Sequence, residues 1–311
     1  MDTTPVSDEV AAGFELPSPL TFQKIFLSCA YWPGVSTGFI PRVVRQLRKN
    51  FRKNSFLLSA NDRRLVLSVE ALRPAAKRQR HSFIPVIEQA ALCGIGPKLV
   101  FTSSEQGYLV SEYIDGRCWN SADFRNMANI ERLVEVLKAV HGWPKIFPER
   151  LISQEVDNLW LRIREEYVKP PKRLEVLQQR MAKVIDYACV HFDERVVCHN
   201  NLLNAQLVET ADGLKLAGWE YAGVNDPYYE LAAIVHHHGF NESQLDHLLH
   251  CYAGQSGHSE RQRFYYNYAI YVYLSALYFC VERVERPLSD QEERIEAKTD
   301  VLVALLHQIG L

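Results

Sequence analysis

The 311-residue sequence lacks several features that mark secreted and membrane-spanning proteins. Its seven cysteines are scattered and include no C-x-x-C pair, which argues against a disulfide framework or a zinc motif and predicts reduced core thiols. The first 20 residues have neither the basic start nor the apolar stretch of a signal peptide, and we expect a loose tail there. The longest aromatic-rich apolar run, 268–281, is shorter than the roughly 20 residues of a membrane span. These absences predict a cytoplasmic protein that is not transmembrane.

Internal repeats and low-complexity segments are also absent, and the composition is that of a globular protein. Hydrophobic residues make up 47% and charged residues 23% of the chain, enough for a large core and two lobes. The net charge of −2 conceals an asymmetry, because residues 42–81 hold twelve Lys or Arg against two acids. That segment therefore carries +10 and the remainder −12. Such a segment favours a polyanion such as nucleic acid or an anionic membrane, although its basic residues fall on several predicted elements.

The pattern of apolar residues divides the chain into a β-rich part and a helical part. One helical region, within 74–91, accompanies five strand-like runs. The runs are 43–48, 55–60, 65–70, 98–102 and 108–113. Predicted helices then follow at 131–141, 174–188, 229–238, 242–252, 261–282 and 290–309. The sequence thus predicts an α+β protein, with a small antiparallel lobe and hinge at 21–114 and a larger, mostly helical lobe at 115–311.

Residues 195–231 contain two polar clusters that flank a predicted hairpin. A short apolar strand leads into the first cluster, which begins at His199. The hairpin strands, 206–208 and 214–217, surround an Asp-Gly pair, which is a strong turn signal between apolar runs. The second cluster begins at Gly218, directly after the second strand. We therefore expect the two polar clusters to lie close together, as in a functional site.

This segment resembles the catalytic segment of the aminoglycoside and choline phosphotransferases, a kinase-like family that includes thiamine kinases. The family pattern is H-x-D-(x4)-N, then a hairpin ending in I-D-W-E-Y-A-G-x-x-D-P, then an acidic residue before Leu-Ala. The residues that match at the family spacing are His199, Trp219, Glu220, Tyr221, Ala222, Gly223, Asp226, Pro227, Glu230, Leu231 and Ala232. The resemblance covers about residues 42–260 and implies a two-lobed, protein-kinase-like fold.

The resemblance fails at the three positions that carry the chemistry of the family. Asn201 stands where the family has its catalytic Asp, Gln206 where it has a metal-binding Asn, and Gly218 where it has a metal-binding Asp. Phosphoryl transfer needs metal ligands and a group that orients the acceptor, whereas a neutral amide is a poor base and glycine offers no side-chain ligand. Glu220 is a fallback metal ligand. The resemblance implies that His199 supports the loop through a backbone hydrogen bond and is not the base.

Further family positions belong to the nucleotide cleft. In this sequence they are Ser68, Glu88, Glu112, Tyr113 and Ile114. The resemblance implies that the last three offer backbone groups to adenine, and that Glu88 pairs with a basic residue, whose position Ser68 occupies. The glycine-rich phosphate turn falls at 49–53, which contains no glycine. Arg52 and Lys53 are possible anion contacts there, and a solvated basic turn is the alternative.

Retention of the scaffold residues without the chemical groups favours a catalytically impaired family member. We interpret the chain as a pseudokinase that binds a small molecule or a protein partner, with no metal site assigned. The alternative is an active kinase that uses ATP and Mg²⁺, with rearranged metal ligands, on a choline-, thiamine- or aminoglycoside-like acceptor. A second alternative is polyanion binding through the basic small lobe. No cofactor is assigned unless the kinase alternative holds.

Overall fold

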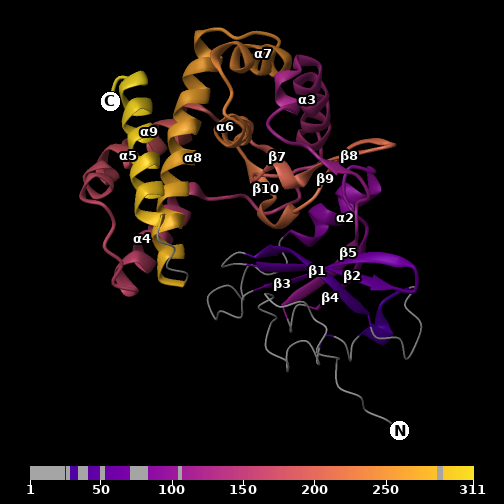
Figure 1. The fold of residues 1–311 in the computed structure, drawn as a ribbon. Helices are drawn as coiled ribbons and strands as arrows, with labels where there is room; N and C mark the ends of the chain where they lie inside the picture. The colour runs from indigo at the N-terminus through magenta and orange to yellow at the C-terminus, as the bar shows by residue number, and fades with distance from the viewer. Residues whose placement is uncertain are drawn as a thin grey trace. The chain divides into compact units, whose positions relative to one another are not determined.

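The computed structural model describes residues 25, 29–33, 41–49, 53–70, 83–103, 107–285 and 290–311. They belong to two compact units, and most of their strands and helices are labelled in Figure 1. The first unit comprises Met1–His81 and Pro97–Ile114, and the second comprises Ser82–Gly96 and Asp115–Leu311. An antiparallel sheet in the N-terminal region and helices in the C-terminal region confirm the predicted α+β fold class.

The first unit is built on one antiparallel sheet with the strand order β1-β2-β3-β5-β4. The strands are β1 (Arg42–Lys49), β2 (Lys53–Ala60), β3 (Arg63–Glu70), β4 (Leu99–Ser103) and β5 (Tyr108–Glu112). Asn61 and Asp62 form the turn between β2 and β3 with φ angles of 47° and 60°, the left-handed values that a two-residue hairpin requires. The core of this unit is formed by Ile25, Cys29, Trp32, Phe56, Leu58, Ala60, Leu65, Leu67, Val69, Tyr108 and Val110.

The second unit is mostly helical. Its helices are α2 (Ile84–Leu92), α3 (Met127–His141), α4 (Ile152–Glu165), α5 (Lys172–His191), α6 (Pro227–His238), α7 (Glu242–Ala253), α8 (His258–Glu285) and α9 (Gln291–Gln308). The long helix α8 packs against α4, α5, α6 and α9, which buries Tyr273 and Leu277 completely. None of the helices in the described ranges is long and apolar enough to cross a membrane.

Short strands in the helical unit carry the two polar clusters. β7 (Val196–Cys198) pairs with β10 (Gly223–Asn225), while β8 (Leu207–Thr210) pairs with β6 (Arg117–Cys118) and β9 (Gly213–Leu216). At the open end of the β8–β9 hairpin, the Ala217 N–H donates to the Gln206 carbonyl at 2.9 Å. The hairpin therefore brings the ends of the two polar clusters together, as the sequence predicts.

Helix α4 was not predicted, although its sequence carries a helical signal. Val156, Leu159, Trp160 and Ile163 follow the i, i+3, i+4, i+7 spacing of an amphipathic helix, and all four are buried. Helix α2 begins at Ile84 with a proline in its first turn, as expected for a helix start. Residues 71–82 and the predicted tail at 1–20 lie outside the described residues.

The cysteines are only partly the core residues that the sequence predicts. None of the seven forms a disulfide, and Cys29, Cys198 and Cys280 are buried. Cys93, Cys118 and Cys189 are exposed, so the prediction is wrong for them. They lie at the end of α2, in the short strand β6 and on the outer face of α5. At these places a cysteine can be exposed even though its neighbours in the sequence are apolar.

Candidate functional site

The loop after β7 is anchored at its first residue. His199 is fully buried, and its Nε2 donates a hydrogen bond to the Ala217 carbonyl at 2.9 Å. Its ring lies 4.8 Å from that of Trp219, which stacks on Trp143 at 5.6 Å. The histidine therefore joins the start of the first polar cluster to the residue before the second, a contact of the loop-supporting kind expected from the sequence.

Asn200 holds the same loop through its side-chain amide, a role that the sequence did not reveal. The residue is 3% exposed and has a φ of 66°, in the left-handed region that asparagine tolerates better than most residues. Its Nδ2 lies 3.0–3.3 Å from three backbone oxygens, and its Oδ1 accepts from the Asn225 amide at 2.8 Å. The three oxygens belong to Cys198, Tyr221 and Gly223. One buried side chain thus satisfies carbonyls on both sides of the β7–β10 pair.

A buried chain of hydrogen bonds extends from Asn200 to α7. The Asn200 backbone N–H donates to Glu230 Oε1 at 2.7 Å, and Glu230 Oε2 lies 2.8 Å from His141 Nε2. The other ring nitrogen of His141 lies 2.7 Å from the Tyr252 hydroxyl. Glu230 is 0% exposed, so its carboxylate depends on these partners in place of water. Sequence matching found Glu230, but His141 and Tyr252 are distant in the chain and gave no signal.

Asp226 fixes the start of α6 after β10. Its Oδ1 accepts the Tyr228 N–H at 2.8 Å as a helix N-cap, and Pro227 occupies the first helical turn. The Arg263 guanidinium lies 3.0 Å and 3.1 Å from its two carboxylate oxygens. The two family-matching residues Asp226 and Pro227 therefore serve to start helix α6.

His238, at the end of α6, closes the loop from the other side. Its Nε2 donates to the Leu202 carbonyl at 3.2 Å, and its ring stacks on Phe124 at 3.9 Å. Burial disfavours the charged imidazolium and lowers the pKa of His238 to about 4. The consecutive residues His236 and His237 instead contact Tyr268 and Tyr271, so the triple histidine is a set of packing residues and brings no three nitrogens together.

Gln206 and Gly218 are in direct contact at the open end of the hairpin. Gly218 has a φ of 82°, and a Cβ atom placed on it would lie 2.8 Å from Gln206 Cγ and 3.1 Å from Gln206 Nε2. The Gln206 side chain is 3% exposed, and its Oε1 accepts the Leu203 N–H at 2.7 Å. The space that a side chain at position 218 would need is therefore filled by Gln206, whose amide oxygen is turned back into the loop.

Asn201 and Glu220 are the remaining polar residues at this end. Both are half-buried, and the Asn201 side chain makes no hydrogen bond to the described residues. Magnesium prefers oxygen ligands that include one or two carboxylates. Asn201 and Gln206 provide neutral amides and Gly218 provides no side chain, so these three positions do not fit a magnesium ion. Glu220, in the short turn Trp219–Tyr221, is the nearby carboxylate in sequence.

Ser68 and Glu88, the predicted ion-pair positions, have different surroundings. Ser68 is buried in β3, where its Oγ lies 3.2 Å from that of Ser55 on β2. Glu88 lies on the exposed face of α2, and its carboxylate has no ion pair among the described residues. Arg52 lies outside the described residues, and only the backbone of Lys53 is described. Their anion contacts remain predictions, as does polyanion binding, because much of the basic segment is likewise undescribed.

The predicted hinge continues β5 at the edge of the first unit. Glu112 forms an ion pair with Arg63 at 2.9 Å, and its N–H donates to a backbone carbonyl within the unit. The Tyr113 N–H donates to the Arg64 carbonyl at 3.0 Å, and the Arg64 guanidinium lies 5.2 Å from the Tyr113 ring. Tyr113 and Ile114 are half-buried. Adenine binding by these residues remains a prediction.

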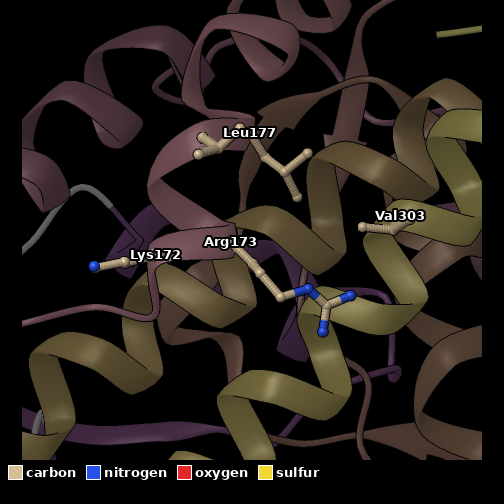
Figure 2. Close-up of a pocket in the computed structure, with 5 residues that line it drawn as sticks. Lys172, Arg173, Leu177 and Val303 are labelled. Carbon is tan, nitrogen blue, oxygen red and sulfur yellow. The ribbon is translucent and has the colours of Figure 1, made fainter.

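A hollow on the helical unit lies apart from these clusters. Figure 2 shows it between α5 and α9, lined by Lys172, Arg173, Val176, Leu177 and Val303. Arg173 is engaged there in an ion pair with Asp300 at 2.7 Å. The hollow is open and mostly apolar, and it holds none of the predicted site residues.

Comparison with known proteins identifies the family. The profile of the phosphotransferase enzyme family matches residues 43–264, close to the 42–260 of the resemblance seen in the sequence. The chain belongs to this family. It is also 27% identical over 139 residues to the LicA homologue of Mycoplasma capricolum, a match that covers 45% of this chain and about half (54%) of that relative.

Solved structures of phosphotransferases share the fold. A choline/ethanolamine kinase family protein of Mesorhizobium loti has a TM-score of 0.72 at 20% identity, over 92% of this chain and 95% of that one. The choline kinase LicA of Streptococcus pneumoniae has a TM-score of 0.74 at 16% identity, over 91% of this chain and 98% of that one. Nearly the whole chain therefore has the same fold as these two solved structures.

Proposed function

We propose that this chain is a catalytically impaired phosphotransferase, a pseudokinase, that binds a small ligand or a protein partner. The family match supports an ancestry in which Asn201, Gln206 and Gly218 occupy the positions of the catalytic Asp and two metal ligands. Metal ions neutralise the charge that develops on the transferred phosphoryl group, so their loss removes a main source of catalysis. General base catalysis alone contributes roughly 10²- to 10⁴-fold.

The contact between Gln206 and Gly218 is the observation that carries the proposal. A glycine alone would leave space for water or for a metal held by neighbouring groups. Here the space beside Gly218 holds the buried Gln206 side chain, with Cγ 2.8 Å from the position of a Cβ. Because Gln206 Oε1 already accepts a 2.7 Å hydrogen bond, it would have to break that bond before it coordinated a cation. The two substitutions thus form one packed arrangement that offers no carboxylate to a metal ion.

The ligand class that we propose first is an amino alcohol. Solved structures with this fold include a choline/ethanolamine kinase family protein and an ethanolamine kinase of Plasmodium vivax, and one of LicA is a complex with AMP. A protein that retains an acceptor pocket without metal ligands would bind the alcohol without phosphorylating it. Nucleotide binding, if retained, would not depend on Mg²⁺.

Calorimetric titration separates these outcomes. We expect choline or ethanolamine to bind with the same affinity in the presence of ATP and Mg²⁺ and in the presence of EDTA. Phosphorylated product should not accumulate in either mixture. Strong Mg²⁺-dependent stabilisation by ATP, followed by phosphorylation of choline, thiamine or an aminoglycoside, would contradict the proposal. If no amino alcohol binds and no product forms, a protein partner is favoured over a small ligand.

An active kinase with rearranged ligands is the second candidate, and the position of Glu220 favours it. This half-buried carboxylate lies two residues after Gly218 in a tight turn, so it is the group on that turn able to attract a cation. The candidate requires that Glu220→Gln abolish turnover. A rate that is unchanged in Glu220→Gln would remove its main support, whereas Asn201→Ala provides a matched control at the position of the catalytic Asp.

A further inference from the structure

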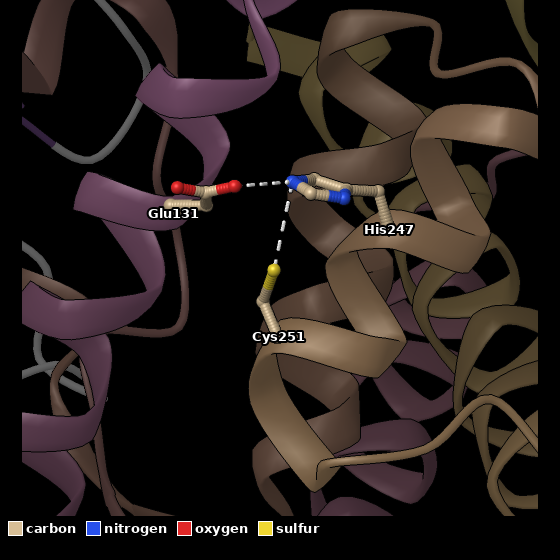
Figure 3. A group of neighbouring side chains, drawn as sticks. All are labelled: Glu131, His247 and Cys251. Atoms are coloured by element: carbon tan, nitrogen blue, oxygen red, sulfur yellow. Dashed lines mark hydrogen bonds and ion pairs between the residues drawn. The ribbon is translucent and has the colours of Figure 1, made fainter.

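Three potential metal ligands converge between α3 and α7, away from the loop after β7. Figure 3 shows Glu131 on α3 facing His247 and Cys251 on α7. Glu131 Oε1 lies 3.1 Å from His247 Nε2, and Cys251 Sγ lies 3.6 Å from the same nitrogen. His247 and Cys251 are four residues apart, a spacing that places both side chains on one face of a helix. The group is half-exposed, so an ion can reach it from solvent.

The distances between these atoms resemble those between ligands of one tetrahedral ion. With bonds of about 2.3 Å from zinc to sulfur and about 2.0 Å from zinc to nitrogen or oxygen, tetrahedral angles separate sulfur from nitrogen by about 3.5 Å and nitrogen from oxygen by about 3.3 Å. The observed separations are 3.6 Å and 3.1 Å, and all three atoms lie within 4.8 Å of one another. Only small side-chain movements would be needed to bind an ion.

We propose that Glu131, His247 and Cys251 form a site for a thiolate-binding divalent cation, with zinc as the preferred ion and water as the fourth ligand. A thiolate and an imidazole favour zinc over magnesium or calcium, which prefer oxygen ligands. Binding would displace the thiol proton. The contacts of His247 with Glu131 and Cys251 would then be replaced by bonds from all three side chains to the ion. The Lys138 ammonium donates to the Cys251 carbonyl at 2.8 Å and so is held on the backbone.

The site would tether two helices that support the loop after β7. Cys251 precedes Tyr252, whose hydroxyl lies 2.7 Å from His141 Nδ1, and His141 terminates α3. His141 in turn contacts Glu230, which accepts the Asn200 N–H. A cation between α3 and α7 would therefore fix both helices at the outer end of this buried hydrogen-bond chain. Zinc should raise the unfolding temperature of the protein for this reason.

Cobalt is a suitable probe because Co²⁺ replaces Zn²⁺ and a thiolate ligand gives it a charge-transfer band. The apo protein is titrated with Co²⁺ and then with Zn²⁺, and zinc affinity is measured by competition with a chelating dye. We expect one equivalent of Co²⁺, a thiolate band, and its loss when Zn²⁺ is added. Cys251→Ser should abolish the band. Glu131→Gln, which changes an exposed side chain, should weaken zinc binding by roughly 100-fold, since even groups outside the ligand shell contribute 10- to 100-fold.

Matched variants distinguish this site from adventitious binding. Cys189→Ser removes an exposed cysteine on α5, and His250→Gln removes an exposed histidine on α7. Both should retain the band and the zinc affinity of the wild type. The proposal is overturned if the wild type shows no thiolate band, if Cys251→Ser retains it, or if Glu131→Gln binds zinc as tightly as the wild type.

Discussion

Two sets of residues in and around the loop after β7 differ in how they are held. His199, Asn200 and Glu230 are buried, and each makes hydrogen bonds to backbone or side chains that would otherwise lack a partner away from water. Asn201 is half-buried and makes no side-chain hydrogen bond to described residues, while Gln206 fills the space beside Gly218. The first set determines the shape of the loop, and we propose that the second set occupies the positions where the family has its chemical groups.

The difference shows that loop shape and chemistry depend on separate side chains. Removing a buried hydrogen-bonding group leaves its partner unsatisfied, which typically costs about 1–3 kcal/mol. Replacing a carboxylate at the edge of a site has no such structural cost if a neutral side chain packs in its place. The frame can therefore persist without the groups that bind metal, and the following variants test this contrast.

The largest effect is expected at Glu230. Its replacement by Ala leaves the Asn200 N–H and the His141 ring without their buried acceptor, so the free energy of unfolding should fall by about 4 kcal/mol. Urea denaturation measures this change. Glu165→Ala, which removes an exposed carboxylate on α4, should change stability by less than about 0.5 kcal/mol. Equal effects of the two substitutions would show that the buried chain does not hold the loop.

A smaller loss is expected at Asn200. Asn200→Ala removes the amide that faces three carbonyls and places an alanine at a φ of 66°, which together should cost about 3 kcal/mol. Asn200→Gly loses the same hydrogen bonds but accepts the backbone conformation, so it should be about 1 kcal/mol more stable than Asn200→Ala. If Ala and Gly are equivalent in thermal unfolding, the left-handed backbone is not maintained in solution.

The packing of Gln206 against Gly218 can be tested with a matched glycine. Gly218→Ala and Gly254→Ala both place a Cβ at φ near 80°, but only at Gly218 does the Cβ meet a neighbour, since Gly254 faces open space. Gly218→Ala should therefore be more destabilising by about 1–2 kcal/mol. In a Gln206→Ala background this excess should disappear. An excess that persists there would show that Gln206 does not fill the space.

The smallest effect concerns pH. Burial lowers the pKa of His238 to about 4, below the 6.5 of an unperturbed histidine, so the unfolded state binds a proton between these values that the folded state does not. Stability conferred by the neutral ring is therefore full above about pH 6.5 and is lost as pH falls towards 4. His238→Gln, which does not titrate, should reduce the stability lost between about pH 6.5 and about pH 5.5 by about 1 kcal/mol. Denaturation curves at several pH values would contradict this if the two proteins lose stability in parallel.

The sequence predicted the strands and most helices because their signals are local. The Asn61–Asp62 turn and the alternating apolar residues of β2 and β3 act between near neighbours in the chain. The family pattern likewise located His199, Asp226 and Glu230 in one region. Helix α4 has a clear apolar spacing, so the sequence alone was sufficient to predict it.

Other features of the site depend on contacts between distant segments. His141, the partner of Glu230, lies 89 residues before it, and Tyr252, the partner of His141, lies 111 residues after that histidine, so no local pattern joins them. The role of Asn200 depends on its left-handed backbone and on carbonyls from a different strand. That Gln206 occupies the space beside Gly218 is a matter of side-chain packing, which substitution patterns alone do not specify.

Mg²⁺-dependent transfer of the γ-phosphoryl group of ATP is the activity that a pseudokinase should lack. Purified wild-type protein would be incubated at high enzyme concentration with labelled ATP and with choline, ethanolamine, thiamine or an aminoglycoside, in Mg²⁺ or in EDTA. We expect phosphorylated product to form at the same background rate in both conditions. Product that forms only with Mg²⁺, and that Glu220→Gln abolishes, would contradict the pseudokinase proposal and identify an active kinase with rearranged metal ligands.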